Sequence, residues 1–151
     1  MNRDIQALLI ANGALVLLAG FAAGMPYGSE VVASIAPGAA AADFAEPLRA
    51  WHMAHLEGVL NGLLMIATAA AAGFPTLSQG AQKVVFWGLV VSGWTNIVAS
   101  TISALTGGRG TGITGLDWNT LDFLLFMTGI VGAVAAMIAV VLGALRTRRE
   151  A

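Results

Sequence analysis

The sequence predicts an all-α integral membrane protein, a four-helix bundle forming a single transmembrane domain over residues 1–151. The chain is 58% hydrophobic and only 10% charged, whereas an ordinary soluble domain is roughly 45–50% apolar and about 25% charged. In addition, four apolar stretches of about 20 residues, the length that crosses a bilayer as a helix, take up most of the chain. We therefore expect a multi-pass protein of a lipid bilayer, located in the bacterial inner (cytoplasmic) membrane.

The spans are predicted at about residues 5–25, 50–72, 84–106 and 121–145. The first stops at Pro26 and the second at Gly73–Pro75, because proline and glycine favour turns. The third stops at the glycine-rich run 107–110, and the fourth at the basic run 146–149. The connection 26–49 is long for a simple turn, so we expect it to lie along the surface or to fold over the bundle.

Two patterns predict where helices start. Asp43 and Glu46 form the D-x-x-E spacing of a capping box, so the second helix is expected to begin before the membrane does. Residues 119–122 form a similar pattern, which makes helix capping the structural alternative for Asp122.

The basic residues predict that both termini are cytoplasmic, because short cytoplasmic loops carry an excess of Lys and Arg. One side of the membrane would have five basic residues, namely Arg3, Lys83, Arg146, Arg148 and Arg149. The other side would have two, Arg49 and Arg109.

Charge and composition also exclude several functions. A formal net charge of −1 without a basic patch offers no surface for nucleic acid. The absence of cysteine excludes disulfides, thiolate metal sites, iron–sulfur clusters and cysteine nucleophiles. A cofactor would have to be held by histidine, carboxylate or neutral polar groups.

The second span carries the densest chemistry, with His52, His55, Glu57 and Asn61 within about three turns. Polar groups at membrane depth are functional candidates by default, because lipid cannot solvate them. His52 and His55 share one stripe of the helix, whereas Glu57 and Asn61 share another. His55 and Asn61 are roughly 120° apart, so they cannot touch one small group and could serve opposite sides of a subunit boundary.

The third span places Ser92, Asn96, Ser100 and Ser103 on one continuous stripe, which is expected to face the bundle or an interface. Counted from the outer boundary, His55 and Ser100 lie roughly 8–9 Å deep, and Asn61 and Asn96 roughly 15–17 Å deep. Asp122 lies near the shallower layer. These positions predict a polar pocket in the outer half of the membrane.

Each candidate also has a purely structural interpretation. His52 can snorkel towards the headgroups, Glu57 can be a neutral acid bonded to a carbonyl, and the two asparagines can join helices. Close helix packing explains a set of glycines, namely Gly58, Gly62, Gly88, Gly93, Gly129 and Gly132. His55 is the hardest to explain in this way, because it is too deep to snorkel and its nitrogen can bind iron.

Two motifs resemble the styrene oxide isomerase family. They are Ala54-His55 followed by Leu60-Asn61-Gly62, and Gly93-Trp94-x-Asn96 on the next span. Weaker similarity continues through Arg109-Gly110 to Asp122, so that the resemblance covers about Arg49 to Gly129. The first span is similar only in being apolar.

The resemblance implies a homotrimer that holds haem b between neighbouring subunits. His55 would be the axial iron ligand, Asn61 a polar group beside the open face of the iron, and Asn96 part of the supporting wall. Ser100 completes the candidate catalytic residues. The other expected cofactor contacts are Gly58, Gly62, Trp94, Arg109 and Asp122.

The implied reaction is the Meinwald rearrangement, in which a small apolar aryl epoxide becomes an aldehyde without net redox change. Ferric iron would accept the epoxide oxygen as a Lewis acid, a benzylic cation would form, and hydride would migrate. An apolar pocket would exclude the water that otherwise gives a diol. A preorganised amide at Asn61 could orient the oxygen.

The chain departs from the family pattern at three positions. Ser100 stands where the pattern has a tyrosine, and His52 and Glu57 are additions. These differences bear on the identity of the substrate more than on the fold or the haem. Two alternative functions follow: a haem protein for electron transfer or sensing, with His52 or another residue as second ligand, and a cofactor-free membrane subunit or small transporter that uses Glu57.

Overall fold

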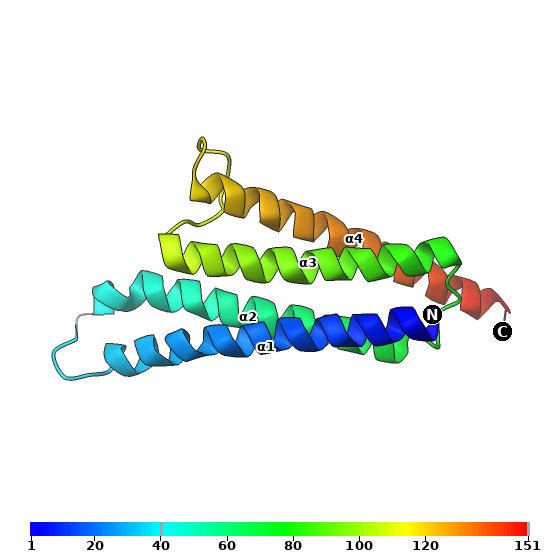
Figure 1. Cartoon of the computed structure of the whole chain (residues 1–151), viewed down its shortest axis with the longest axis horizontal. Helices are drawn as coiled ribbons and strands as arrows, with labels where there is room; N and C mark the ends of the chain where they lie inside the picture. Colours follow the sequence, from blue (N-terminus) through cyan, green and yellow to red (C-terminus); the bar gives the residue numbers. More distant parts are fainter. Residues whose placement is uncertain (40, 151) are drawn as a thin grey trace.

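The computed structural model describes residues 1–39 and 41–150, and it consists of four long helices (Figure 1). They are α1 (Arg3–Ser34), α2 (Ala41–Ala71), α3 (Gln79–Thr106) and α4 (Trp118–Glu150). All four are long and apolar enough to cross a membrane. The all-α class and the four predicted spans are confirmed.

The first two helices extend beyond the predicted spans. α1 continues through Pro26 as far as Ser34, so the expected stop at Pro26 was wrong. A proline removes only one backbone donor from a helix, and membrane helices tolerate this loss. Most of the 26–49 connection is therefore helix rather than a surface segment. α2 already begins at Ala41, ahead of the proposed capping box, and the side chain of Asp43 lies outside the described residues.

The helices form two antiparallel hairpins that pack side by side (Figure 1). α1 packs along α2, α3 packs along α4, and the hairpins meet mainly between α2 and α3. Within residues 1–39 and 41–150, the backbone of α4 approaches α3 closely but not α1 or α2. The predicted bundle is thus an open arrangement, and apolar side chains of α4 such as Val131 and Ile138 remain exposed. These surfaces need lipid or another protein chain as their neighbour.

Glycines bring the two helices of each hairpin into backbone contact. A Cβ atom at Gly58 would lie 2.3 Å from the Cα of Gly20, and one at Gly62 would lie 2.6 Å from the carbonyl oxygen of Gly13. Gly88 and Gly132 pack in the same way between α3 and α4. The close-packing interpretation therefore holds for these positions. Because α1 covers Gly58 and Gly62, they are not available as cofactor contacts within the subunit.

Both termini lie at the same end of the molecule (Figure 1). The terminal ammonium of Met1 donates to the carbonyl oxygen of Ala72, which directly follows the end of α2. The hydroxyl of Thr147 near the C-terminus donates to the carbonyl oxygen of Phe74. This arrangement agrees with the prediction that the N-terminus, the α2–α3 loop and the C-terminus share one side of the membrane.

The cap of α4 is Asp117 rather than Asp122. The backbone N–H of Thr120 donates to Oδ1 of Asp117 over 2.8 Å, and the hydroxyl of Thr114 donates to Oδ2 over 2.8 Å. Such a cap satisfies a backbone donor that the first helical turn leaves free. Asp122 is instead fully buried between α3 and α4, so the capping interpretation of its sequence pattern was wrong.

We expect the Asp117 cap to make stability depend on pH under acidic conditions. The backbone hydrogen bond from Thr120, followed by that from Thr114, lowers the pKa of the Asp117 carboxyl from its ordinary value of 3.8. A lowered pKa in the folded state gives stability that is present above the ordinary value and is lost as pH falls through the folded value. Asp117→Asn keeps the oxygen acceptor but not the charge. Thermal unfolding should therefore depend less on pH below about 4 in this variant, and an unchanged dependence would contradict the assignment.

Candidate functional site

His55 is oriented by a hydrogen bond to the neighbouring helix. Its Nδ1 atom lies 2.9 Å from the carbonyl oxygen of Gly20 in α1. Because a carbonyl oxygen can only accept, Nδ1 carries the proton in this arrangement and Nε2 keeps a free lone pair. Metal-binding histidines almost always donate their other ring N–H to a carbonyl, a carboxylate or water. The half-buried imidazole therefore has a free Nε2, the atom through which it could bind a metal.

Residues of α1 make room for this imidazole. A Cβ atom at Gly24 would lie 2.8 Å from Nδ1 of His55, so a side chain there would displace the ring. The ring of Tyr27 lies nearly parallel to both histidine rings, with centroids 4.9 Å from His52 and 6.3 Å from His55. Sequence analysis missed these supports of α1. Gly20 and Gly24 form a GxxxG spacing, the signal of close helix packing in membranes that would have pointed to them.

A second polar cluster joins α2 to α3. The Asn61 amide nitrogen lies 2.8 Å from a carboxylate oxygen of Glu57 and 2.9 Å from the Glu57 backbone oxygen. The cluster faces α3, where a Cβ atom at Gly93 would lie 3.7 Å from Cβ of Asn61. The side chain of Asn96 lies near the Glu57 carboxyl. The prediction that Glu57 and Asn61 share a stripe is confirmed, and the cluster agrees with equal depths for Asn61 and Asn96.

The two polar groups occupy different faces of α2. His55 is bonded to α1, whereas Asn61 and Glu57 lie against Asn96 of α3. One subunit therefore does not bring His55 and Asn61 to the same small group. This agrees with the prediction from their angular separation on the helix. A site that uses both residues would have to be completed by a neighbouring chain.

The serine stripe of α3 faces α4. Ser100 is buried, and its hydroxyl donates to the backbone oxygen of Asn96 over 2.9 Å. Ser103 donates to Asp122 over 2.7 Å in a fully buried pair. Within the part of the chain that the structure describes, three buried polar atoms lack a partner: Ser92 Oγ, Asn96 Oδ1 and Asp122 Oδ1. The stripe thus forms a polar seam in the α3–α4 interface.

Two further candidates have partners elsewhere. The indole N–H of Trp94 donates to Oδ1 of Asn12 in α1 over 3.0 Å. Arg109, in the α3–α4 loop, forms an exposed ion pair with Glu46 near the start of α2. Trp94 therefore joins the two hairpins through α3 and α1. Arg109 joins the α3–α4 loop to the start of α2.

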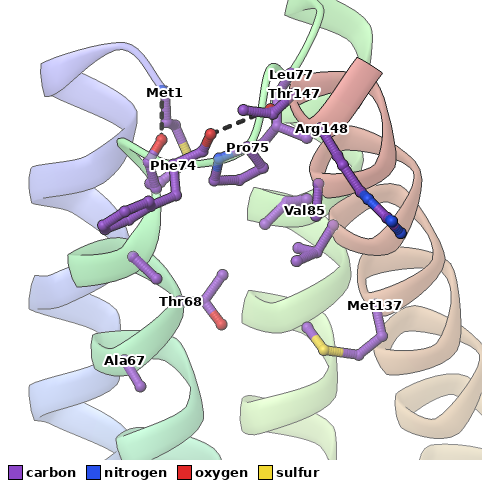
Figure 2. Close-up of a pocket in the computed structure, with 14 residues that line it drawn as sticks. Met1, Ala67, Thr68, Phe74, Pro75, Leu77, Val85, Met137, Thr147 and Arg148 are labelled. Atoms are coloured by element: carbon purple, nitrogen blue, oxygen red, sulfur yellow. Dashed lines mark hydrogen bonds between the residues drawn. The ribbon is translucent and has the colours of Figure 1, made fainter. Parts of the chain in front are cut away.

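A large apolar cavity lies far from this chemistry. It has a volume of about 620 Å³ and lies at the end of the molecule that carries the termini, between α2 and α4 (Figure 2). Figure 2 shows Thr68, Phe74, Val85 and Met137 around it, and its lining contains no histidine, carboxylate or asparagine. Ala67, the lining residue of α2 nearest in sequence to His55, is about three helical turns away from it. No group of three or more potential metal-binding side chains occurs among the described residues.

The chain matches a known protein family over most of its length. The family model described as styrene oxide isomerase matches residues 5–145, which is most of the chain and includes the first span. No curated protein gives a significant match.

Proposed function

Since this chain belongs to the styrene oxide isomerase family, we propose that it isomerises an aryl epoxide of the styrene oxide type to an aldehyde by Meinwald rearrangement. Family membership supports an epoxide isomerase activity, and the four apolar helices support an integral membrane location. The proposal adds haem b as the cofactor and His55 as its protein ligand. It also places both termini on the cytoplasmic side of a bacterial inner membrane.

The geometry of His55 is the observation that carries the cofactor assignment. The 2.9 Å contact with the Gly20 carbonyl leaves Nε2 as the metal-binding atom, and Gly24 leaves space for the ring. The residues present therefore fit a haem iron with one protein ligand, a ligation that leaves a coordination position open. When bound, haem would supply a Lewis-acidic iron that polarises the epoxide oxygen.

The remaining steps depend on the surroundings that the chain provides. The benzylic C–O bond of the epoxide breaks, a hydride moves from the neighbouring carbon to the cationic carbon, and a C=O bond forms. No electron acceptor or donor is consumed. Water would capture the cation as a diol, so a lipid-embedded apolar site favours the aldehyde by excluding water.

We further propose that the working site lies between subunits of a homotrimer. His55 and the Asn61–Asn96 cluster lie on different faces of α2. Each chain would therefore contribute His55 to one site between subunits and the Asn61–Asn96 cluster to another. The open arrangement of the hairpins leaves apolar faces for a second copy to cover. No comparable observation supports the electron-transfer or sensing alternative or the cofactor-free alternative. For the former, His52 stacks on Tyr27 and lies only three residues from His55. Two histidines this close on one helix cannot bind one iron from both sides.

The activity can be tested with detergent-purified protein supplied with haem and styrene oxide but no reductant. We expect phenylacetaldehyde as the product, with no added electron source and little diol. Asp117→Asn, at the exposed start of α4, is the matched control and should retain the activity at neutral pH. A haem-loaded protein that yields only the diol, or no product, would contradict the proposed reaction.

A further inference from the structure

We propose that Glu57 fixes Asn61 so that its carbonyl oxygen, and not its N–H groups, faces the substrate. This inference rests on the proposed function and assigns Glu57 as a positioning residue of that site. The sequence predicted that the Asn61 amide orients the epoxide oxygen, a role that requires a free N–H group. The geometry around Glu57 points to the opposite polarity.

The hydrogen-bond inventory of Asn61 supports this assignment. A side-chain amide has two N–H donors and one oxygen acceptor. One donor of Asn61 is directed to the Glu57 backbone oxygen at 2.9 Å and the other to the Glu57 carboxylate at 2.8 Å. Both donors are thus engaged. Flipping the amide would place its oxygen against two other oxygens, so the orientation is determined by its partners.

The Glu57 carboxyl lies at the interface of α2 with α3. It accepts a hydrogen bond from Asn61 on α2 and lies near Asn96 on α3, and both Glu57 and Asn61 are half-buried. Gly93 lets α3 approach α2 closely here, since a Cβ atom at that position would lie 2.1 Å from Cε of Met65 and in van der Waals contact with Cβ of Asn61. The two contacts of the Asn61 amide nitrogen, one with the Glu57 carboxyl and one with the Glu57 backbone oxygen, therefore hold the Asn61 amide in place.

This polarity changes what the site can stabilise. As the epoxide opens, positive charge develops on the benzylic carbon and negative charge on the oxygen. A fixed carbonyl oxygen near the carbon favours the positive charge, because preorganised dipoles act on charge as it develops. Stabilisation of the epoxide oxygen would then have to come from elsewhere in the completed site. The same carbonyl oxygen should disfavour the binding of an anion beside it.

Anion binding to the haem-loaded protein tests the assignment. Fluoride and azide are titrated optically against the unaltered protein, Glu57→Leu, Glu57→Gln and the double variant Glu57→Leu/Asn61→Leu. Glu57→Leu frees the one Asn61 N–H that the carboxyl accepts, which should tighten fluoride binding by about 10-fold or more, the effect of one hydrogen bond to a charged group. Glu57→Gln keeps an acceptor oxygen and should stay closer to the unaltered protein. The double variant should lose this tighter fluoride binding, because it has no Asn61 amide.

A vibrational measurement covers the case in which Glu57→Leu does not fold. In the ferrous carbon monoxide complex, a nearby hydrogen-bond donor lowers the C–O stretching frequency and a nearby acceptor raises it. Asn61→Ala should therefore lower the frequency if Asn61 presents its oxygen. A rise in frequency, or equal tightening of fluoride in Glu57→Leu and Glu57→Gln, would overturn the inference. Failure of the unaltered protein to take up haem would instead contradict the proposed function.

Discussion

Replacing His55 with alanine is expected to abolish haem binding, so that the purified variant lacks the Soret band expected of the unaltered protein. The imidazole is the single protein ligand in the proposed site, and its Nε2 is directed by the Gly20 carbonyl. Alanine removes that ligand without adding bulk. The measurement is the ratio of Soret to protein absorbance after haem supplementation. Added free imidazole, which restores the missing ligand, should recover part of the band.

His52→Ala is the matched control for this prediction. His52 lies on the same helix and stacks on the same Tyr27 ring, but it is exposed. We expect this variant to keep its haem. Loss of the Soret band in both variants, or in neither, would contradict the assignment of His55 as the specific ligand.

Gly58→Val is expected to have the largest effect on the fold. Even the first side-chain atom at this position would lie 2.3 Å from the Cα of Gly20, and both partners are helix backbone that cannot turn aside. Overpacking typically costs about 1–3 kcal/mol, and a branched side chain against backbone should exceed that range. The α1–α2 hairpin would separate, and the bond between His55 and Gly20 would be lost with it. Thermal unfolding in detergent measures the loss.

Gly80→Ala provides the control for glycine replacement. Gly80 lies in α3, and nothing lies within 4 Å of a Cβ atom there. Because alanine favours helix over glycine by about 1 kcal/mol, this variant should be as stable as the unaltered protein or more so. If Gly58→Val unfolds at the same temperature as Gly80→Ala, the close contact between α1 and α2 is not present.

The spans were predictable because a bilayer imposes a length and an apolar composition on any helix that crosses it. Helix ends were less predictable. Pro26 ends a helix in most soluble contexts, but here the helix continues through it to Ser34. Asp122 fits a capping pattern, yet Asp117 caps the helix and Asp122 pairs with Ser103. Local pattern alone does not distinguish a capping carboxylate from one buried by a neighbouring helix.

The candidate site was predictable where it depends on the period of a single helix. Glu57 and Asn61 are four residues apart, so their contact follows from helix geometry. The partner of His55 could not be predicted in the same way, because it is a backbone carbonyl of α1 and leaves no side-chain signal. Gly24 and Gly20 carry the only trace of it, as small residues one turn apart in an otherwise apolar segment.

The absorption spectrum of the unaltered protein, purified in detergent after haem supplementation, shows directly whether the chain binds haem. We expect a Soret band that co-purifies with the protein, and a pyridine haemochrome typical of haem b. A folded protein that stays colourless under these conditions would contradict the claim that His55 holds a haem iron.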